Sequence, residues 1–348
     1  MILTVIFAVI CFSLIIFVHE LGHFLTARLF GVRVHEFALG MGPKIFSKKR
    51  GETLYSIRAI PLGGFCSMEG EDTESDDEGS FSKKPRYARF IILAAGASMN
   101  IILGFLVCII YVAVAFGPSG LPSVTVDSVL AESDLADFLQ PGDRIVRIND
   151  SKVNIKRDID FAMQRAAGKE SHITVSRDGE LLSAEFVPYV SQYTDGTPAY
   201  LLGVMTRSEK ANVFNVIREA FYQTIWSGKL VFVSLGMLLG GETGLSDMSG
   251  PVGVVGVMNE AASQGGLVGL LNLLYLMSFI SVNIGIMNLL PIPALDGGRL
   301  FFVVVEAIRR KPIPADKEGI VHFIGLVFLL GLMVFVTWND ISRLFFGG

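Results

Sequence analysis

Long apolar runs separated by polar stretches dominate the chain. Four of them, residues 2–30, 90–116, 267–290 and 320–338, are long enough to cross a bilayer, which takes about 20 mostly apolar residues in a helix. The pattern therefore predicts a polytopic α-helical membrane protein with four transmembrane helices, and the lipid bilayer is its expected surroundings.

Composition supports this prediction and narrows the partners. Hydrophobic residues make up 51% of the chain and charged residues 18%, whereas a soluble domain averages about 25% charged residues. Basic residues do not cluster with aromatic ones, so nucleic acid is not an expected partner. The three cysteines contain no Cys-x-x-Cys pair and predict neither a disulfide framework nor a cysteine metal site.

Loop charge predicts the orientation, because lysine and arginine accumulate in cytoplasmic loops. Eleven of them lie between Arg28 and Arg89, and a further cluster, Arg309-Arg310-Lys311, separates the third and fourth apolar runs. Both stretches are expected in the cytoplasm. Residues 117–265 and both termini are then expected outside it.

Within this outer stretch, residues 121–206 have the short strands and the single helix, at 158–167, of a small α+β domain. Residues 139–149, LQPGDRIVRIN, resemble a characteristic segment of PDZ domains. Such domains bind peptide ends by adding a strand to a sheet edge, so peptide C-termini are possible ligands. A small β domain of another kind is the alternative.

The segment at 210–265 is less regular. An apolar piece at 230–239, too short to span alone, follows residues 213–226, which carry Arg218 and Glu219. We interpret it as an amphipathic, interfacial helical segment; a re-entrant segment is the alternative.

The first cytoplasmic loop contains a predicted β-hairpin. Residues 44–47 and 53–60 flank a glycine-containing turn and are expected to pair, with the second strand ending at Pro61-Leu62-Gly63-Gly64. The hairpin is more apolar than a free loop should be. It is therefore expected to re-enter the membrane, where protein or a water-filled cavity must satisfy its backbone.

Three ionisable residues interrupt the first apolar run, in the motif His19-Glu20-Leu21-Gly22-His23. An ionisable group at the centre of a membrane helix costs about 2.5–3.5 kcal/mol by insertion scales, which makes a functional role the default hypothesis. His19 and His23 are four residues apart, so both imidazoles lie on one helix face and can bind one metal ion. Glu20 lies beside them as a candidate general base.

A catalytic zinc site usually has three protein ligands, and the third apolar run supplies a candidate. This run ends with two prolines, Pro291 and Pro293, followed by Asp296. Proline loosens a helix, so the chain can bend and turn Asp296 inward. The alternative is that Asp296 only caps a following helix at 300–308.

The His-Glu-x-x-His motif combined with Asn-x-x-Pro-x-Pro-x-Leu-Asp-Gly-Gly at 288–298 is similar to the site-2 protease family of intramembrane zinc metalloproteases. The bacterial branch with four membrane segments and one PDZ domain is the most similar. The resemblance covers essentially the whole chain. It implies a metalloendopeptidase of the bacterial inner membrane, with Zn²⁺ bound by His19, His23 and Asp296, Glu20 as the base, and the active site toward the cytoplasmic side.

The resemblance also implies substrate contacts. Asn288 matches an asparagine that holds the substrate backbone, Asn100 ends a Gly96–Asn100 segment that lacks the family's proline, and Gly42 lies in the re-entrant β element. An exposed strand edge in the 44–62 hairpin is expected to hold an unwound substrate segment. The residues expected to bind substrate are Asn288, Pro291, Pro293, Asn100, Gly42, Ile57 and Leu62.

The expected organisation is a protease core in two halves, residues 1–116 and 266–348, with the PDZ-like domain at 121–206 and the helical segment at 210–265. By resemblance, the substrates are single-pass membrane proteins already trimmed outside the membrane, such as anti-sigma factors, or remnant signal peptides. The PDZ-like domain then filters substrates by size. Two alternatives remain: a catalytically silent scaffold and a zinc transporter.

Overall fold

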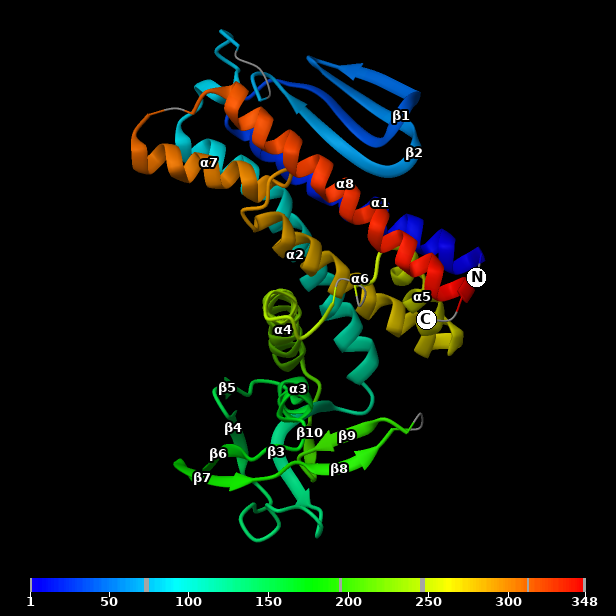
Figure 1. Cartoon of the computed structure of the whole chain (residues 1–348), viewed down its shortest axis with the longest axis vertical. Helices are drawn as coiled ribbons and strands as arrows, with labels where there is room; N and C mark the ends of the chain where they lie inside the picture. Colours follow the sequence, from blue (N-terminus) through cyan, green and yellow to red (C-terminus); the bar gives the residue numbers. More distant parts are fainter. Residues whose placement is uncertain (1, 72–74, 194–195, 245–247, 312, 347–348) are drawn as a thin grey trace. The chain divides into compact units, whose positions relative to one another are not determined.

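The structure is a computed structural model that describes residues 2–71, 75–193, 196–244, 248–311 and 313–346 (Figure 1). The chain forms two compact units. One consists of Met1–Cys108 and Ser227–Gly348, and the other is Ile109–Trp226. The predicted PDZ-like domain lies wholly within the second unit.

Four helices are long and apolar enough to cross a membrane: α1 (Ile2–Leu29), α2 (Arg86–Phe116), α6 (Gly266–Leu289) and residues Asp316–Arg343 of α8 (Ala315–Phe346). They coincide with the four predicted runs, and the multi-pass membrane protein is confirmed. The structure extends α2 and α8 beyond the apolar runs because polar residues continue both helices at their ends.

The other helices are α3 (Lys156–Ala166), α4 (Val213–Leu239), α5 (Pro251–Ser263) and α7 (Asp296–Arg309), with a short 3-10 turn at Phe81–Lys83. The two pieces predicted at 213–226 and 230–239 are one continuous helix, α4. Its interfacial placement stays a prediction. The predicted helix at 300–308 begins earlier, at Asp296, so Asp296 is its first residue and the residue before the helix is Leu295.

Helix α5 begins at a Gly250-Pro251-Val252-Gly253 segment. The backbone N–H of Gly253 donates a hydrogen bond of 2.8 Å to Oδ2 of Asp340, which is 5% exposed on α8. The first N–H groups of a helix have no partner within it. Asp340 therefore satisfies one of them from a neighbouring helix.

The predicted hairpin exists but is longer than expected. It consists of β1 (Val34–Arg50) and β2 (Thr53–Met68), paired antiparallel around a turn at Gly51. The prediction that Pro61–Gly64 ends the second strand is wrong. Irregular register and the positive φ of Gly63, +94°, let the strand bend there and continue, because proline is tolerated at strand edges and bulges.

This bend gives the hairpin two outer segments. Residues 36–39 of β1 have partners both in residues 54–57 and in residues 64–67 of β2, and residues 44–50 pair with 53–58. The order across the sheet is therefore 64–68, 34–39, 53–57 and 44–50. The segment 64–68 lies against α1: a Cβ on Gly64 would be 3.2 Å from Cγ of Glu20.

An aromatic cluster holds this sheet on the helices. The rings of Phe24 and Phe37 lie 5.1 Å apart, and those of Phe24 and Tyr55 lie 5.8 Å apart. Ile92 from α2 and Leu300 from α7 belong to the same buried cluster. Its packing fixes β2 relative to α1 and α7, which carry the predicted metal ligands.

The second unit contains a six-stranded sheet in the order β10-β3-β4-β6-β7, with β5 paired to β4, and a separate hairpin β8-β9. The strands are β3 (Leu121–Val129), β4 (Arg144–Ile148), β5 (Ser151–Lys152), β6 (Ser171–Arg177), β7 (Glu180–Phe186), β8 (Tyr189–Gln192), β9 (Pro198–Leu201) and β10 (Val204–Glu209). Together with α3 they form an α+β domain. Its PDZ identity stays a prediction.

A buried ion pair closes the loop that carries the PDZ-like sequence. Asp143 is 1% exposed and accepts hydrogen bonds of 2.7 Å from both Nε and Nη2 of Arg177. The guanidinium of Arg177 lowers the pKa of Asp143 below its usual value. This bidentate pair thus ties the start of β4 to the end of β6.

Candidate metal centre

The three predicted metal ligands lie together. His19 and His23 are one turn apart on α1, and their Nε2 atoms are 3.2 Å apart. Oδ2 of Asp296, at the start of α7, is 3.0 Å from Nε2 of His19 and 3.3 Å from Nε2 of His23. Residues from opposite ends of the chain therefore converge on one point.

Hydrogen bonds fix how each imidazole is oriented. Nδ1 of His23 donates to the carbonyl oxygen of Ile92 at 2.8 Å. A carbonyl only accepts, so the neutral ring carries its proton on Nδ1 and presents a lone pair on Nε2. Nδ1 of His19 lies 3.3 Å from the amide of Asn100, whose Oδ1 is buried without a hydrogen bond. Turning this amide over lets Oδ1 accept from His19, which leaves the Nε2 lone pair of His19 at the site as well.

These groups fit a zinc ion. Two imidazole lone pairs and a carboxylate oxygen face one another, and that oxygen accepts no hydrogen bond. A cation between the groups would satisfy all three. Zn–N bonds of about 2.0–2.1 Å at a tetrahedral angle separate ligand atoms by about 3.3 Å, which matches the three separations in this site, from 3.0 to 3.3 Å.

The charge of the site agrees with a cation. Oδ2 of Asp296 is 3.0 Å and 3.3 Å from the two imidazole nitrogens, so a cation between these groups would be balanced by a carboxylate. Burial raises the pKa of the nearby Cys66 thiol, which therefore stays protonated.

Two glycines bring α2 close enough to form this site. A Cβ on Gly96 would lie 2.3 Å from Nε2 of His23, and one on Gly22 would lie 2.6 Å from the carbonyl oxygen of Ala95. Neither glycine has a role predicted from the sequence. The Gly96–Asn100 segment, which begins with Gly96, was the feature of the sequence that could have indicated this close approach.

An open cleft of about 520 Å³ leads to the three ligands. Glu20 lines it, and the backbone N–H of Cys66 in β2 bonds to the Glu20 carboxylate. Arg299 of α7 and Glu71, just after β2, also line the cleft and are joined by an ion pair of 2.8 Å. The described lining residues are His19, Glu20, His23, Phe65, Cys66, Ser67, Met68, Glu71, Leu93, Ala294, Leu295, Asp296 and Arg299.

The structure gives Asn100 a contact within the protein. It is 0% exposed, its side-chain amide contacts His19, and its backbone carbonyl oxygen accepts a hydrogen bond of 2.7 Å from Ser281 Oγ. The close approach of α1 and α2 turns it inward, toward an imidazole. Its contact with substrate stays a prediction.

The other residues expected to bind substrate are not among the described lining residues of the cleft, and their contacts with substrate stay predictions. Gly42 is in β1. Ile57, 49% exposed, is in the part of β2 that precedes the bend. Asn288 is in the last turn of α6, and Pro291 and Pro293 are in the loop between α6 and α7. The backbone of Leu62 lies in β2, but its side chain is outside the described part of the structure.

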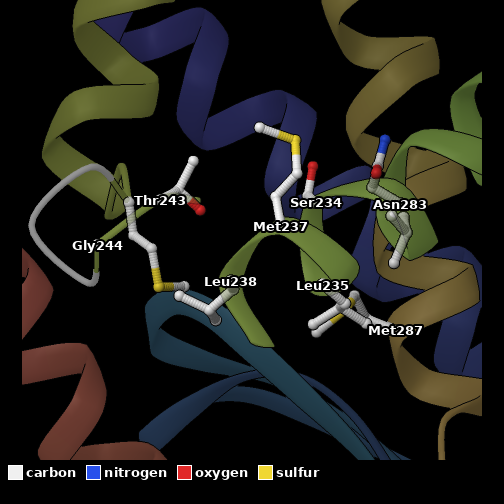
Figure 2. Close-up of a pocket in the computed structure, with 10 residues that line it drawn as sticks. Ser234, Leu235, Met237, Leu238, Thr243, Gly244, Asn283 and Met287 are labelled. Atoms are coloured by element: carbon white, nitrogen blue, oxygen red, sulfur yellow. The ribbon is translucent and has the colours of Figure 1, made fainter. Parts of the chain in front are cut away.

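A second cavity, of about 370 Å³, lies apart from these ligands in the same unit (Figure 2). Leu235, Met237 and Leu238 of α4 line it together with Asn283 and Met287 of α6. Its lining is mainly apolar, and no carboxylate, histidine or cysteine is among the described lining residues. We assign no chemistry to it.

Comparison with known proteins identifies the family of the chain. The sequence pattern of peptidase family M50 matches residues 7–332, and the chain belongs to this family. The predicted site-2 protease family is thereby confirmed, and the protein is a zinc-dependent metalloendopeptidase. This favours the enzyme over the scaffold and the transporter.

Individual relatives match along the whole chain. A putative zinc metalloprotease of Clostridium perfringens (strain 13 / Type A) is 37% identical over 340 residues, covering 97% of this chain and 98% of the relative. The regulator of sigma-W protease RasP of Bacillus subtilis (strain 168) is 33% identical over 426 residues, covering 98% of this chain and 99% of RasP. These similarities support a role in regulated intramembrane proteolysis.

Proposed function

We propose that His19, His23 and Asp296 hold the zinc ion and that Glu20 is the general base for hydrolysis of a peptide bond within or near the membrane. The observation that carries this proposal is the convergence of two imidazole nitrogens and one carboxylate oxygen at zinc-like separations. Zinc bound there supplies a strong nucleophile from water at neutral pH and polarises the scissile carbonyl.

Glu20 performs the proton transfers. Its carboxylate lines the same cleft as the three ligands, so it can accept the proton of the attacking water and pass it to the leaving nitrogen. The N–H of Cys66 orients the carboxylate by a hydrogen bond. A general base has to be within hydrogen-bond reach of its proton, and this contact holds Glu20 toward the cleft.

The substrate backbone binds along residues 64–68 of β2 in this proposal. A membrane helix hides its carbonyl groups in its own hydrogen bonds, so the segment to be cut has to unwind and extend. An extended segment can pair with a free strand edge. Residues 64–68 are an outer segment of the sheet, and Phe65–Met68 line the cleft. None of residues 44–50, the other outer segment, is among the described lining residues.

Cross-linking tests this placement. A photoreactive benzoylphenylalanine in place of Ser67, in a Glu20→Gln background that does not consume substrate, is expected to label a bound membrane substrate. The same group in place of Lys48, on the other outer segment, is the matched control and is expected to label little. Mass spectrometry of the adducts checks the result. Equal labelling from both positions would remove the 64–68 edge from the mechanism.

The substrates we propose are single-pass membrane proteins already trimmed outside the membrane, such as anti-sigma factors, or remnant signal peptides. The name of the B. subtilis relative, regulator of sigma-W protease, supports the first class.

We propose that the protein lies in a bacterial inner membrane. Both termini and residues 121–206 are then outside the cytoplasm, and the site faces the cytoplasm. The basic residues between Arg28 and Arg89 support this orientation. The apolar hairpin is then the re-entrant element.

The α+β domain at 121–206 is the proposed PDZ-like size filter. In proteoliposomes, the full chain is expected to cut a trimmed single-pass substrate faster than its full-length form. Deletion of residues 121–206 is expected to remove this preference but not cleavage, because the proposed ligands and base lie in the other unit. Cleavage of both substrates is followed by gel electrophoresis. A deletion variant that still prefers the trimmed form would refute the filter.

A further inference from the structure

The loop before Asp296 is held in an unfavourable conformation. Ala294 has a φ of +74°, in the region that residues with a Cβ seldom adopt. Such a conformation persists only where the surrounding structure holds it. Ala294 lies two positions before the proposed ligand Asp296. The contacts that hold Ala294 therefore also determine the position of the Asp296 backbone.

A histidine of α8 contacts this residue. The backbone N–H of Ala294 donates a hydrogen bond of 3.0 Å to Nδ1 of His322, whose side chain is 14% exposed. The ring of His322 also lies 5.8 Å from that of Phe302 on α7. His322 therefore sits between the strained loop and the helix that Asp296 begins. Because Nδ1 accepts the hydrogen bond, its ring proton is on Nε2.

A glycine three residues further along α8 completes the contact. A Cβ on Gly325 would lie 2.4 Å from Cβ of Pro293 and 2.8 Å from its carbonyl carbon. Pro293 thus rests directly on the backbone of α8. Gly331 on the same helix faces open space, with no atom within 4 Å of an added Cβ. A residue without a Cβ is therefore needed at position 325 of α8 but not at position 331.

We propose that His322 and Gly325 are positioning residues for the metal site, although α8 contributes no ligand to it. They hold the loop at Pro293 and Ala294 so that the Asp296 carboxylate faces the two imidazoles. This inference rests on the proposed role of Asp296 as a zinc ligand. It assigns a purpose to a histidine that stands alone in the sequence.

Zinc affinity of the full-length protein in detergent tests the proposal, measured by competition with a chromogenic chelator. His322→Phe keeps a ring against Phe302 but removes the acceptor, and Gly325→Ala pushes Pro293 away. Each is expected to weaken zinc binding by about 10–100-fold, the usual effect of losing a group that orients a ligand. The kcat should fall more than KM changes. Gly331→Ala is the matched control and should behave as wild type.

Two further variants separate positioning from general packing. His322→Asn places an acceptor oxygen near the position of Nδ1 and should recover most of the zinc affinity. Ala294→Gly relieves the strained φ and should partly restore affinity in the His322→Phe background. If neither variant restores affinity, His322 acts only in packing and the inference is overturned.

Asp296→Ala distinguishes failure of this inference from failure of the proposed site. If zinc binding survives Asp296→Ala, the proposed ligand set is wrong and the inference falls with it. If Asp296→Ala abolishes zinc binding but His322→Phe and Gly325→Ala bind zinc as tightly as wild type, only the inference is wrong. Thermal unfolding of each metal-free variant confirms that it is folded.

Discussion

Glu20→Gln is expected to lower the rate of peptide cleavage by about 10²–10⁴-fold, the usual contribution of a positioned general base, while zinc content stays at the wild-type level. Glutamine has the shape of glutamate and can still accept the hydrogen bond from Cys66, but it cannot take a proton from water. Glu20 is also not one of the three converging ligands. Cleavage of a purified membrane substrate and metal analysis of the same sample check both parts.

Glu260→Gln is the matched control, because Glu260 is exposed on α5 and has no proposed role. It should leave cleavage and zinc content unchanged. If Glu20→Gln cuts substrate at the wild-type rate, the proton transfers belong to another group. If it instead loses zinc, Glu20 takes part in holding the metal, and the ligand set has to be revised.

Asp296→Ala is expected to weaken zinc binding by more than about 100-fold, since the loss of a group that only orients a ligand already costs 10–100-fold. Two imidazoles remain, one short of the three protein ligands usual for catalytic zinc. Cleavage should fall with zinc content, and added zinc should restore it only in part. Metal content after dialysis and cleavage against zinc concentration give both measurements.

Asp316→Ala, at an exposed aspartate at the start of α8, is the control for this variant and should bind zinc as wild type does. A zinc content of about one per chain in dialysed Asp296→Ala would contradict the site. The third ligand would then have to be sought elsewhere, and the close approach of Asp296 to the imidazoles would be a simple ion pair.

Local sequence predicted the parts of the protein that depend on local rules. Apolar runs located the four membrane helices because length and hydropathy determine insertion. The four-residue spacing of His19 and His23 required only helical periodicity to place both imidazoles on one face. The position of Asp296 beside them followed from no local rule: it was predicted from the need for a third ligand and from two prolines that interrupt a helix.

Features that depend on tertiary contacts were missed. Pro61 and Gly63 usually end a strand, but here the strand bends and continues, since its neighbours in the sheet leave room for bulges. The rotation of α2 turns Asn100 onto His19 because Gly22 and Gly96 allow close helix packing. His322 is 26 positions from Asp296, and only the folded chain brings it to Ala294.

The proposed ligands are separated by most of the polypeptide: His23 lies in the first membrane helix and Asp296 follows the third. During synthesis, a nascent chain that has not reached residue 296 has only the two imidazoles, so on the proposed ligand set it would be inert while its early helices insert. Fragments that end before that residue would likewise lack hydrolytic activity. With Asp296 as the third ligand, the order of the residues along the chain would delay the onset of proteolysis until translation is nearly finished.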